Sequence, residues 1–150
     1  MRALLQRVAE ASVAAEGRVQ GAIGPGLVVY LGCRRGDTEA DAEALARRVA
    51  RYRVFPDEAG RSNLDLRDVG GAVLLLPQFT LVADTRKGNR PSFTEALEPE
   101  AARRLVARFA AVLEAEGVPV AQGLFGAVMT VRQVGVGPAS FLLERRSSRT

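Results

Sequence analysis

Three segments of this 150-residue chain contain residues that could do chemistry. The first is Pro77-Gln78-Phe79-Thr80-Leu81, where two polar side chains interrupt an apolar stretch. A buried polar group without a partner costs roughly 1–3 kcal/mol, so Gln78 and Thr80 must either find partners or face solvent on alternate positions. A bulge at Pro77 would free nearby backbone N–H groups, which can stabilise an oxyanion. The pattern alone favours side chains that simply face solvent.

The second segment spans residues 135–140 and places Gly137 directly before Pro138. A glycine at this position permits a sharp turn and a close approach of the backbone to a ligand, although an ordinary turn between two strands is the simpler interpretation. The third segment is a polar loop over residues 83–93 with three cations, which either contact phosphate oxygens or are solvated. These cations are Arg86, Lys87 and Arg90.

The residues that are missing narrow the chemistry further. The sequence has no histidine and therefore no Ser-His-Asp or Cys-His couple. Its one cysteine, Cys33, cannot form an internal disulfide, and without histidine it argues against a structural zinc site. Its one lysine, Lys87, argues against a buried Schiff-base lysine. A reaction run by this chain would depend on carboxylates, hydroxyls, backbone groups or the substrate itself.

Composition indicates one soluble domain over residues 1–150, with 47% hydrophobic and 25% charged residues. The longest apolar runs fall far short of the ~20 residues that span a bilayer, and the N-terminal stretch is too short for a signal-peptide core. We therefore expect a cytoplasmic protein. The net charge is +4, and a loose basic tail over about residues 144–150 supplies +2 of it, from three arginines and one glutamate. What remains is a mild bias towards polyanions.

Apolar patterning predicts strands and two helices that would position these segments. The first helix, over residues 38–53, is capped by Asp37 or Thr38, and the second lies between Pro99 and Gly117. Their apolar faces are Ala42, Leu45, Val49 and Tyr52, and Ala102, Leu105, Phe109 and Val112. The strands are residues 2–9, a two-stranded hairpin over 12–23, 27–33, 72–82 interrupted at Pro77, 127–134 and 141–145. This order predicts an α+β domain with packed sheets and both helices on one face.

Taken together, the segments resemble the D-aminoacyl-tRNA deacylase family. The resemblance runs from Met1 to about Leu143 and is carried by EGRVQGAIGPGLVVYLG, VARYRVFPDEAGRSNLDL and PQFTLVADTRKGNRPSF. Family members have Ser-Gln-Phe-Thr-Leu and Gly-Pro-Val-Thr in the first two segments. This chain has Pro at 77 and Ala139-Ser140 after Gly137-Pro138. Phe79 matches the D-specific branch, because a related branch has alanine at that place.

The resemblance implies a β-β-α layered fold, with two sheets in a barrel-like arrangement and two helices. It further implies a homodimer with active sites at the subunit interface. The Gly137–Pro138 peptide would be cis and would reach into the partner's site, where its carbonyls hold the α-ammonium group and crowd out L side chains. Ala139 and Ser140 flank this turn, and Arg7 would steady it.

The implied activity is hydrolysis of D-aminoacyl-tRNA, and of glycine mischarged on the tRNA for alanine, to free amino acid and tRNA. Backbone N–H groups near Phe79 and Thr80 would hold the oxyanion, Gln78 would fix the local geometry, and the 2′-hydroxyl of the terminal adenosine would assist water. Thr80 as a nucleophile is the rival, but no base is visible to activate it. No cofactor or metal is implied, and neither a membrane nor DNA is an expected partner.

Two alternatives from other classes stay open at this point. One is a non-catalytic RNA-binding or editing-associated module, which would bind charged tRNA without turnover. The other is a structural dimer whose arginine tail contacts nucleic acid nonspecifically, with a steep dependence on salt.

Overall fold

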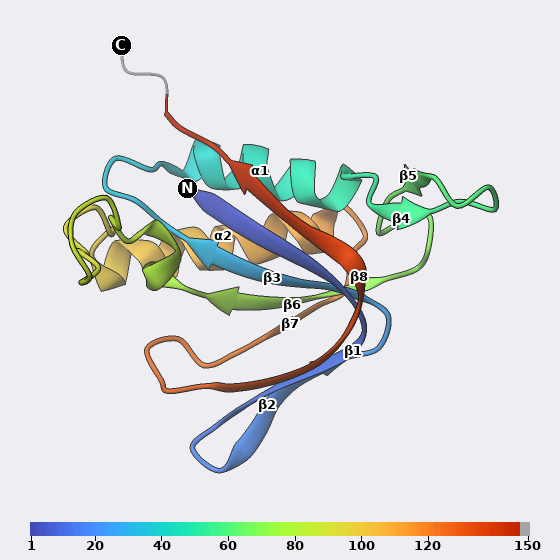
Figure 1. The fold of residues 1–150 in the computed structure, drawn as a ribbon, viewed down its shortest axis with the longest axis horizontal. Coiled ribbons are helices and arrows are strands. Elements are labelled where there is room, and N and C mark those ends of the chain that lie inside the picture. The colour runs from blue at the N-terminus through green and yellow to red at the C-terminus, as the bar shows by residue number, and fades with distance from the viewer. Residues whose placement is uncertain (148–150) are drawn as a thin grey trace.

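The computed structural model describes residues 1–147. Within that range the chain forms eight strands, two α-helices and one short 3-10 helix (Figure 1). The strands are β1 (Arg2–Ala15), β2 (Arg18–Ile23), β3 (Gly26–Gly32), β4 (Phe55–Pro56), β5 (Ser62–Leu64), β6 (Ala72–Pro77), β7 (Val120–Gln122) and β8 (Thr130–Glu144). The helices are α1 (Glu39–Arg51), the 3-10 helix η1 (Phe79–Val82) and α2 (Pro99–Ala115).

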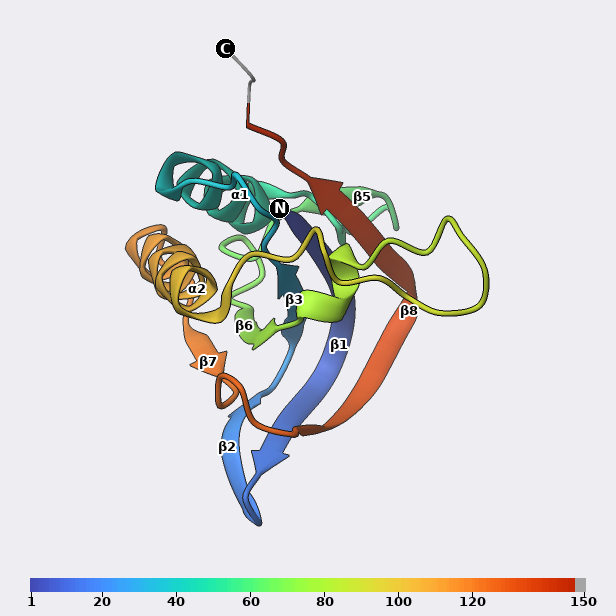
Figure 2. The ribbon, with the colours of Figure 1, turned by 90° about the vertical axis from the view of Figure 1, so that its left-hand side faces the viewer.

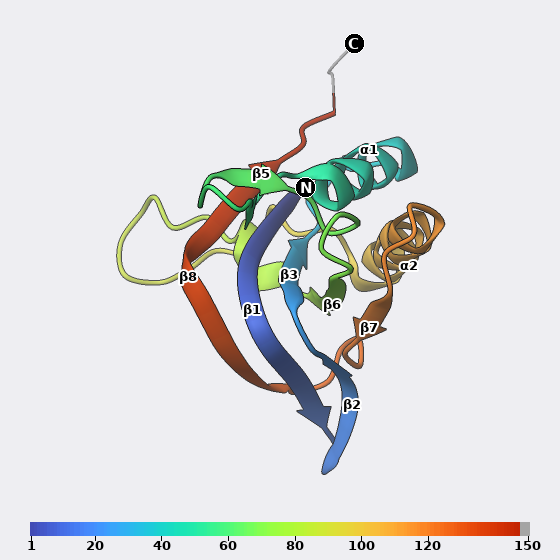
Figure 3. The same ribbon diagram turned by 90° about the vertical axis from the view of Figure 1, so that its right-hand side faces the viewer.

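The long strand β1 organises the main sheet. On one edge it pairs antiparallel with β3 up to Val8 and with β2 from Ala11 onwards, and on the other edge it pairs with β8. Strands β6 and β7 continue the sheet in parallel beyond β3, in the order β2-β1-β3-β6-β7. Because β1 and β8 curve together through the bend, the sheet folds over into a partly closed barrel (Figures 2 and 3).

The barrel-like arrangement and the α+β class are thus confirmed, but the prediction of two barrel-forming sheets needs correction. There is one six-stranded sheet, because β1 and β8 each continue through the bend as a single strand. The second sheet is only the small β4–β5 ribbon.

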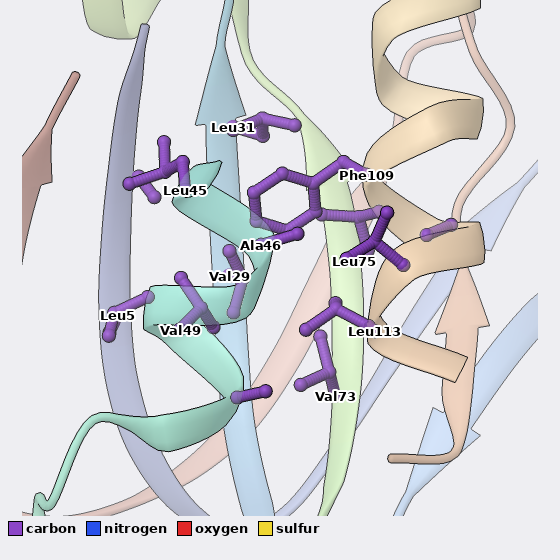
Figure 4. Packing of buried hydrophobic residues seen from close by; sticks show 14 of the residues in the cluster. Leu5, Val29, Leu31, Leu45, Ala46, Val49, Val73, Leu75, Phe109 and Leu113 are labelled. Atoms are coloured by element: carbon purple, nitrogen blue, oxygen red, sulfur yellow. The ribbon is translucent and has the colours of Figure 1, made fainter. Parts of the chain in front are cut away.

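Two apolar clusters occupy the two faces of this sheet. Both helices cover one face, and beneath them Val29, Leu75 and Phe109 belong to the larger cluster (Figure 4). Successive side chains of a strand point to opposite faces, so the neighbours Leu74 and Leu76 belong to a smaller cluster inside the bend. Burial on both faces explains why β3 and β6 are continuous apolar runs rather than alternating ones.

The two predicted helices are present with the expected signals at their ends. Thr38 caps α1 and forms a capping box with Asp41, whose carboxylate accepts hydrogen bonds from the Thr38 backbone and hydroxyl. Pro99 is the first residue of α2, and Gly117 follows its end with φ of +87°. Leu45, Val49, Leu105, Phe109 and Val112 are buried, as their spacing predicts, whereas Tyr52 and Ala102 are half-buried.

The strand boundaries differ from the predictions in several places. Residues 2–9 and the first arm of the hairpin form the single strand β1, and residues 127–134 and 141–145 belong to one paired strand, β8. The short strand β7 was not expected at all. Glu144 ends β8, and the Arg145 N–H donates to the carbonyl of Met1 over 2.9 Å, so the basic tail begins later than residue 144. Residues 148–150 of that tail lie outside the described residues.

Candidate active site

The Pro77–Leu81 segment marks the end of a strand and not its interior. Proline has no N–H to donate, and β6 ends at Pro77. The next residue, Gln78, donates its backbone N–H to the Leu31 carbonyl over 2.8 Å, and the chain then turns into η1. The predicted strand over residues 72–82 is therefore wrong in its second half, and no bulge occurs at Pro77. The alternative of an edge position is confirmed locally, because Pro77 pairs with Leu31 on one side while β7 pairs only with residues 73–75 on the other. The polar residues instead form a turn at the carboxyl ends of β3 and β6.

Gln78 and Thr80 hydrogen-bond to each other. The Gln78 side-chain amide donates to the Thr80 hydroxyl over 2.8 Å. The expected alternate strand positions are therefore wrong, because the two side chains pair across the first turn of η1, but Thr80 does face solvent as expected. No basic group contacts the Thr80 hydroxyl within residues 1–147, so nothing there would activate it as a nucleophile.

Two backbone N–H groups at the start of η1 are open. Among residues 1–147 neither Phe79 nor Thr80 has a hydrogen-bond acceptor for its backbone N–H. The first N–H groups of any helix lack an intrahelical partner, and here no side chain caps them. Both residues are exposed. The turn therefore presents two adjacent donors, as an oxyanion site requires.

A pocket of about 770 Å³ opens beside these donors. Gln78, Phe79 and Thr80 line it, together with apolar side chains from the start of α2 and from the 125–131 segment. Glu98 is its one charged lining residue within the described chain. The Phe79 and Phe93 rings meet edge to face, with their centroids 5.3 Å apart. The volume and apolar lining are typical of a small-molecule site. Phe93 ends the stretch that carries the family resemblance but was not predicted as a site residue, and no motif contains Phe125.

Cys33 also lines this pocket, but its chemistry is suppressed. The side chain is buried, and burial, with the negative charge of Asp37, raises the pKa of its thiol to about 12. A thiol with so high a pKa is not a nucleophile at neutral pH. The pocket thus contains no activated side-chain nucleophile among the described residues.

The Gly137–Pro138 segment lies away from this pocket on β8. Val8 pairs with Gly135 and Gln6 with Ser140, so residues 136–139 form an excursion opposite Arg7 alone. The Gly137–Pro138 peptide bond is cis, as the resemblance implies, and both residues are exposed. Neither lines the pocket of its own chain.

Arg7 holds the base of this excursion. Its Nε donates to the Val136 carbonyl over 3.0 Å, and its Nη1 donates to the Val54 carbonyl. Ala139 is buried, and the Ser140 hydroxyl accepts a hydrogen bond from the Gln6 amide over 3.3 Å. The contacts agree with the steadying role that the resemblance gives to Arg7.

The three cations of the 83–93 loop have different surroundings. The Arg86 guanidinium forms two hydrogen bonds of 2.8 and 2.7 Å to the Asp84 carboxylate, and these bonds hold the pKa of Asp84 far below its usual range. Lys87 and Arg90 are exposed at the tip of the loop, which projects beside β8 (Figure 2). Arg86 also lines a second hollow, of about 330 Å³, with Arg2, Arg34 and Arg146. These three arginines are far apart in the sequence, and no motif connects them.

Residues 1–147 contain neither a metal-binding cluster nor a membrane-spanning helix. No group of three or more cysteine, aspartate or glutamate side chains in residues 1–147 is arranged to hold a metal ion. None of the helices in that range is long and apolar enough to cross a membrane.

The chain is thus an α+β protein whose pocket has the size and lining of a small-molecule site, with two open backbone donors among its lining residues. The D-Tyr-tRNA(Tyr) deacylase family matches residues 4–144, and the chain belongs to that family. A D-aminoacyl-tRNA deacylase from Chloroflexus aurantiacus is 52% identical over 149 residues, covering 99% of this chain and 93% of the relative. The resemblance seen in the sequence is thus confirmed, and with it the prediction that the chain is a deacylase-family enzyme.

Solved structures give the same fold. The structure of a c-Myc DNA Unwinding Element Binding Protein superposes with a TM-score of 0.90 at 34% identity, covering 98% of this chain and 100% of that one. A probable eukaryotic D-amino acid tRNA deacylase has a TM-score of 0.81 at 17% identity, with 95% and 97% covered. The second likeness concerns the fold alone.

Proposed function

We propose that this chain hydrolyses the ester bond of D-aminoacyl-tRNA, releasing the D-amino acid and tRNA. The observation that carries the proposal is the pair of open N–H groups at Phe79 and Thr80, beside a largely apolar pocket. Family membership and the named relatives support the choice of substrate. Glycine mischarged on the tRNA for alanine is a second proposed substrate, because glycine has no side chain that a chiral gate could reject.

Hydrolysis adds water to the ester carbonyl, and the ribose oxygen then leaves with a proton. The two N–H groups would stabilise the negative charge that develops on the carbonyl oxygen. The α-ammonium group already activates the ester, so positioning can replace a strong base. The neighbouring 2′-hydroxyl of the terminal adenosine is the group we assign to assist water. In this scheme Gln78 orients the turn through its bond to Thr80.

Chirality is assigned to a second copy of the chain. Gly137 and Pro138 are exposed and lie outside the pocket of their own chain, so a partner subunit would have to bring them to it. The apolar side chains of Val134, Val136 and Leu142 are also exposed on β8, as an interface strand requires. The carbonyls of Gly137 and Pro138 would bind the α-ammonium group and leave no room for an L side chain.

The test is deacylation of matched D-tyrosyl-tRNA and L-tyrosyl-tRNA by the purified protein, without added metal. We expect the D ester to be hydrolysed and the L ester to be spared. Loss of both esters would contradict the assigned gate. Binding of charged tRNA without turnover would contradict the enzyme and support the RNA-binding module instead.

A mixing experiment tests the shared site. A dimer of Phe79→Ala with Gly137→Val restores one intact site in each mixed pair, and half of all dimers are mixed. Coexpression of the two impaired variants should therefore give about a quarter of wild-type activity, more than either variant alone, if the dimer has two-fold symmetry. No recovery in dimers that purification shows to be mixed would place the whole site within one subunit.

A further inference from the structure

The second hollow lies at the other end of η1 from the pocket. Phe79 and Thr80, at the start of η1, line the pocket, whereas Val82 and the following Ala83 line the hollow. At a rise of ~2 Å per residue a 3-10 helix of this length spans about 6–8 Å. One short turn of chain therefore lines both the pocket and the hollow, and a single extended ligand can reach from the pocket to the hollow.

Four arginines from four separate parts of the chain surround this hollow. Arg2 comes from β1, and Arg34 follows β3. Arg86 comes from the 83–93 loop, and Arg146 follows β8. Asp84 and Glu95 are the acidic lining residues, and Asp84 is already paired with Arg86. Glu144 contacts Arg2 at 2.7 Å. Positive charge is thus in excess around the hollow.

Arg34 is the most buried of the four. Its side chain is only 13% exposed, and its nearest carboxylate is Glu144 at 3.9 Å, too far for a hydrogen bond. Within residues 1–147 its guanidinium donates no hydrogen bond, and no unsatisfied nitrogen is fully buried, so its N–H groups remain accessible. Burial, together with the positive charges of Arg2 and Arg146, lowers the pKa of Arg34. A bound anion would relieve both the repulsion and the missing hydrogen bonds.

We infer that this arginine hollow binds a backbone phosphate of the acceptor strand whose terminal aminoacyl-adenosine occupies the pocket. The inference rests on the proposed function, because the pocket fixes where the end of the strand lies. Guanidinium groups match phosphate oxygens with paired hydrogen bonds, and such contacts position a nucleic acid without reading its sequence. The exposed Lys87 and Arg90 are not needed for this site.

The experiment compares two substrates that share the reacting ester. D-Tyrosyl-tRNA carries the strand phosphates, whereas D-tyrosyl-adenosine carries none. We expect Arg34→Gln to lower kcat/KM at least about tenfold on the tRNA and to leave hydrolysis of the adenosine ester within about twofold of wild type. Loss of one phosphate contact should also reduce the slope of log(kcat/KM) against log[salt] by about 0.7.

Two further variants keep the result interpretable. Arg146→Gln changes an exposed residue after the last strand and should act in the same direction without affecting folding. Arg18→Gln, at the exposed β1–β2 turn, removes the same charge away from the hollow and should change neither substrate. Wild-type rates on tRNA for both Arg34→Gln and Arg146→Gln would overturn the inference. Equal losses on both substrates for both variants would overturn it as well.

Failure of the proposed function would be recognisable separately. If the wild-type protein hydrolyses neither ester, binding of uncharged tRNA decides the question. Weaker binding by Arg34→Gln and Arg146→Gln, with Arg18→Gln unchanged, would still support the phosphate site. Equal tRNA binding by all three variants would overturn the RNA assignment. Displacement of tRNA by inorganic phosphate alone, with the same dependence on salt for every variant, would also overturn it, because the hollow would then be a general anion site.

Discussion

The pocket and the arginine hollow lie at opposite ends of η1 and share that turn, but they differ in size, polarity and charge. The larger one is apolar, with one acidic residue and two open backbone donors, while the smaller one is lined by four arginines. An aminoacyl-tRNA end has the same division, with an uncharged base and ester followed by charged phosphates. In the proposed scheme chemistry and anchoring are separate tasks, and each should be removable without the other.

The largest effect is expected from Phe79→Ala in the apolar pocket. The exposed Phe79 ring, packed edge to face on Phe93, offers a surface for a base or an ester group. Loss of an aromatic stacking surface costs about 1–3 kcal/mol per base, so kcat/KM should fall roughly 10- to 100-fold on D-tyrosyl-tRNA and D-tyrosyl-adenosine alike. Val19→Ala, exposed on the β1–β2 hairpin, is the control. A loss confined to the tRNA substrate would contradict the division of tasks.

Acid should weaken the structure that supports the arginine hollow. Asp41 is buried, and although burial raises its pKa, hydrogen bonds from Ser147, Thr38 and Arg145 lower it from 3.8 to about 2. Because the pKa is lower in the folded state, this stabilisation is complete above pH 4 and is lost as the pH falls from about 4 to 2. It amounts to roughly 2 kcal/mol.

Urea unfolding between pH 6 and pH 2 measures this contribution. Wild type should lose free energy of unfolding below pH 4, and Asp41→Asn should be less stable at pH 6 but less sensitive to acid. Since Asp41 holds residues 145 and 147 on either side of Arg146, the variant should also weaken tRNA binding more than hydrolysis of D-tyrosyl-adenosine. An unchanged acid profile in Asp41→Asn would assign the acid sensitivity to other carboxylates.

The smallest effect is expected from Thr80→Ala. The substitution removes the bond from Gln78 but leaves both backbone N–H groups in place. One hydrogen bond contributes about 0.5–1.5 kcal/mol, so kcat/KM should fall less than about tenfold. Removal of a true nucleophile would cost roughly a thousandfold or more. Single-turnover kinetics on D-tyrosyl-tRNA distinguish the two outcomes.

The helices were predictable because their signals are local. Thr38 and Asp41 form a capping box within four residues, and Pro99 and Gly117 delimit α2. Strand ends were harder, since the apolar run through residues 72–82 contains both β6 and η1, and only Pro77 marks the change. The continuity of β1 and β8 depends on their pairing with each other, and the residues of one strand alone do not show that pairing.

The candidate site residues likewise fall into a group that a local motif predicts and a group that only the fold brings together. Gln78, Phe79 and Thr80 were found because a short motif contains them, and the structure places all three on one pocket. Arg2, Arg34 and Arg146 were missed because they meet only through the tertiary fold. Of the predicted loop cations, only Arg86 joins them.

The excursion of β8 opposite Arg7 has an evolutionary consequence. Strand pairing stops at Gly135 and resumes at Ser140, with regular partners on both sides. An insertion or deletion between these residues would leave both paired stretches in register, provided that Arg7 kept its anchor at Val136. The sheet itself therefore sets no limit on the length of this projecting segment, and any constraint on its residues must come from what the segment binds, whereas the adjoining strands are also constrained by their pairing.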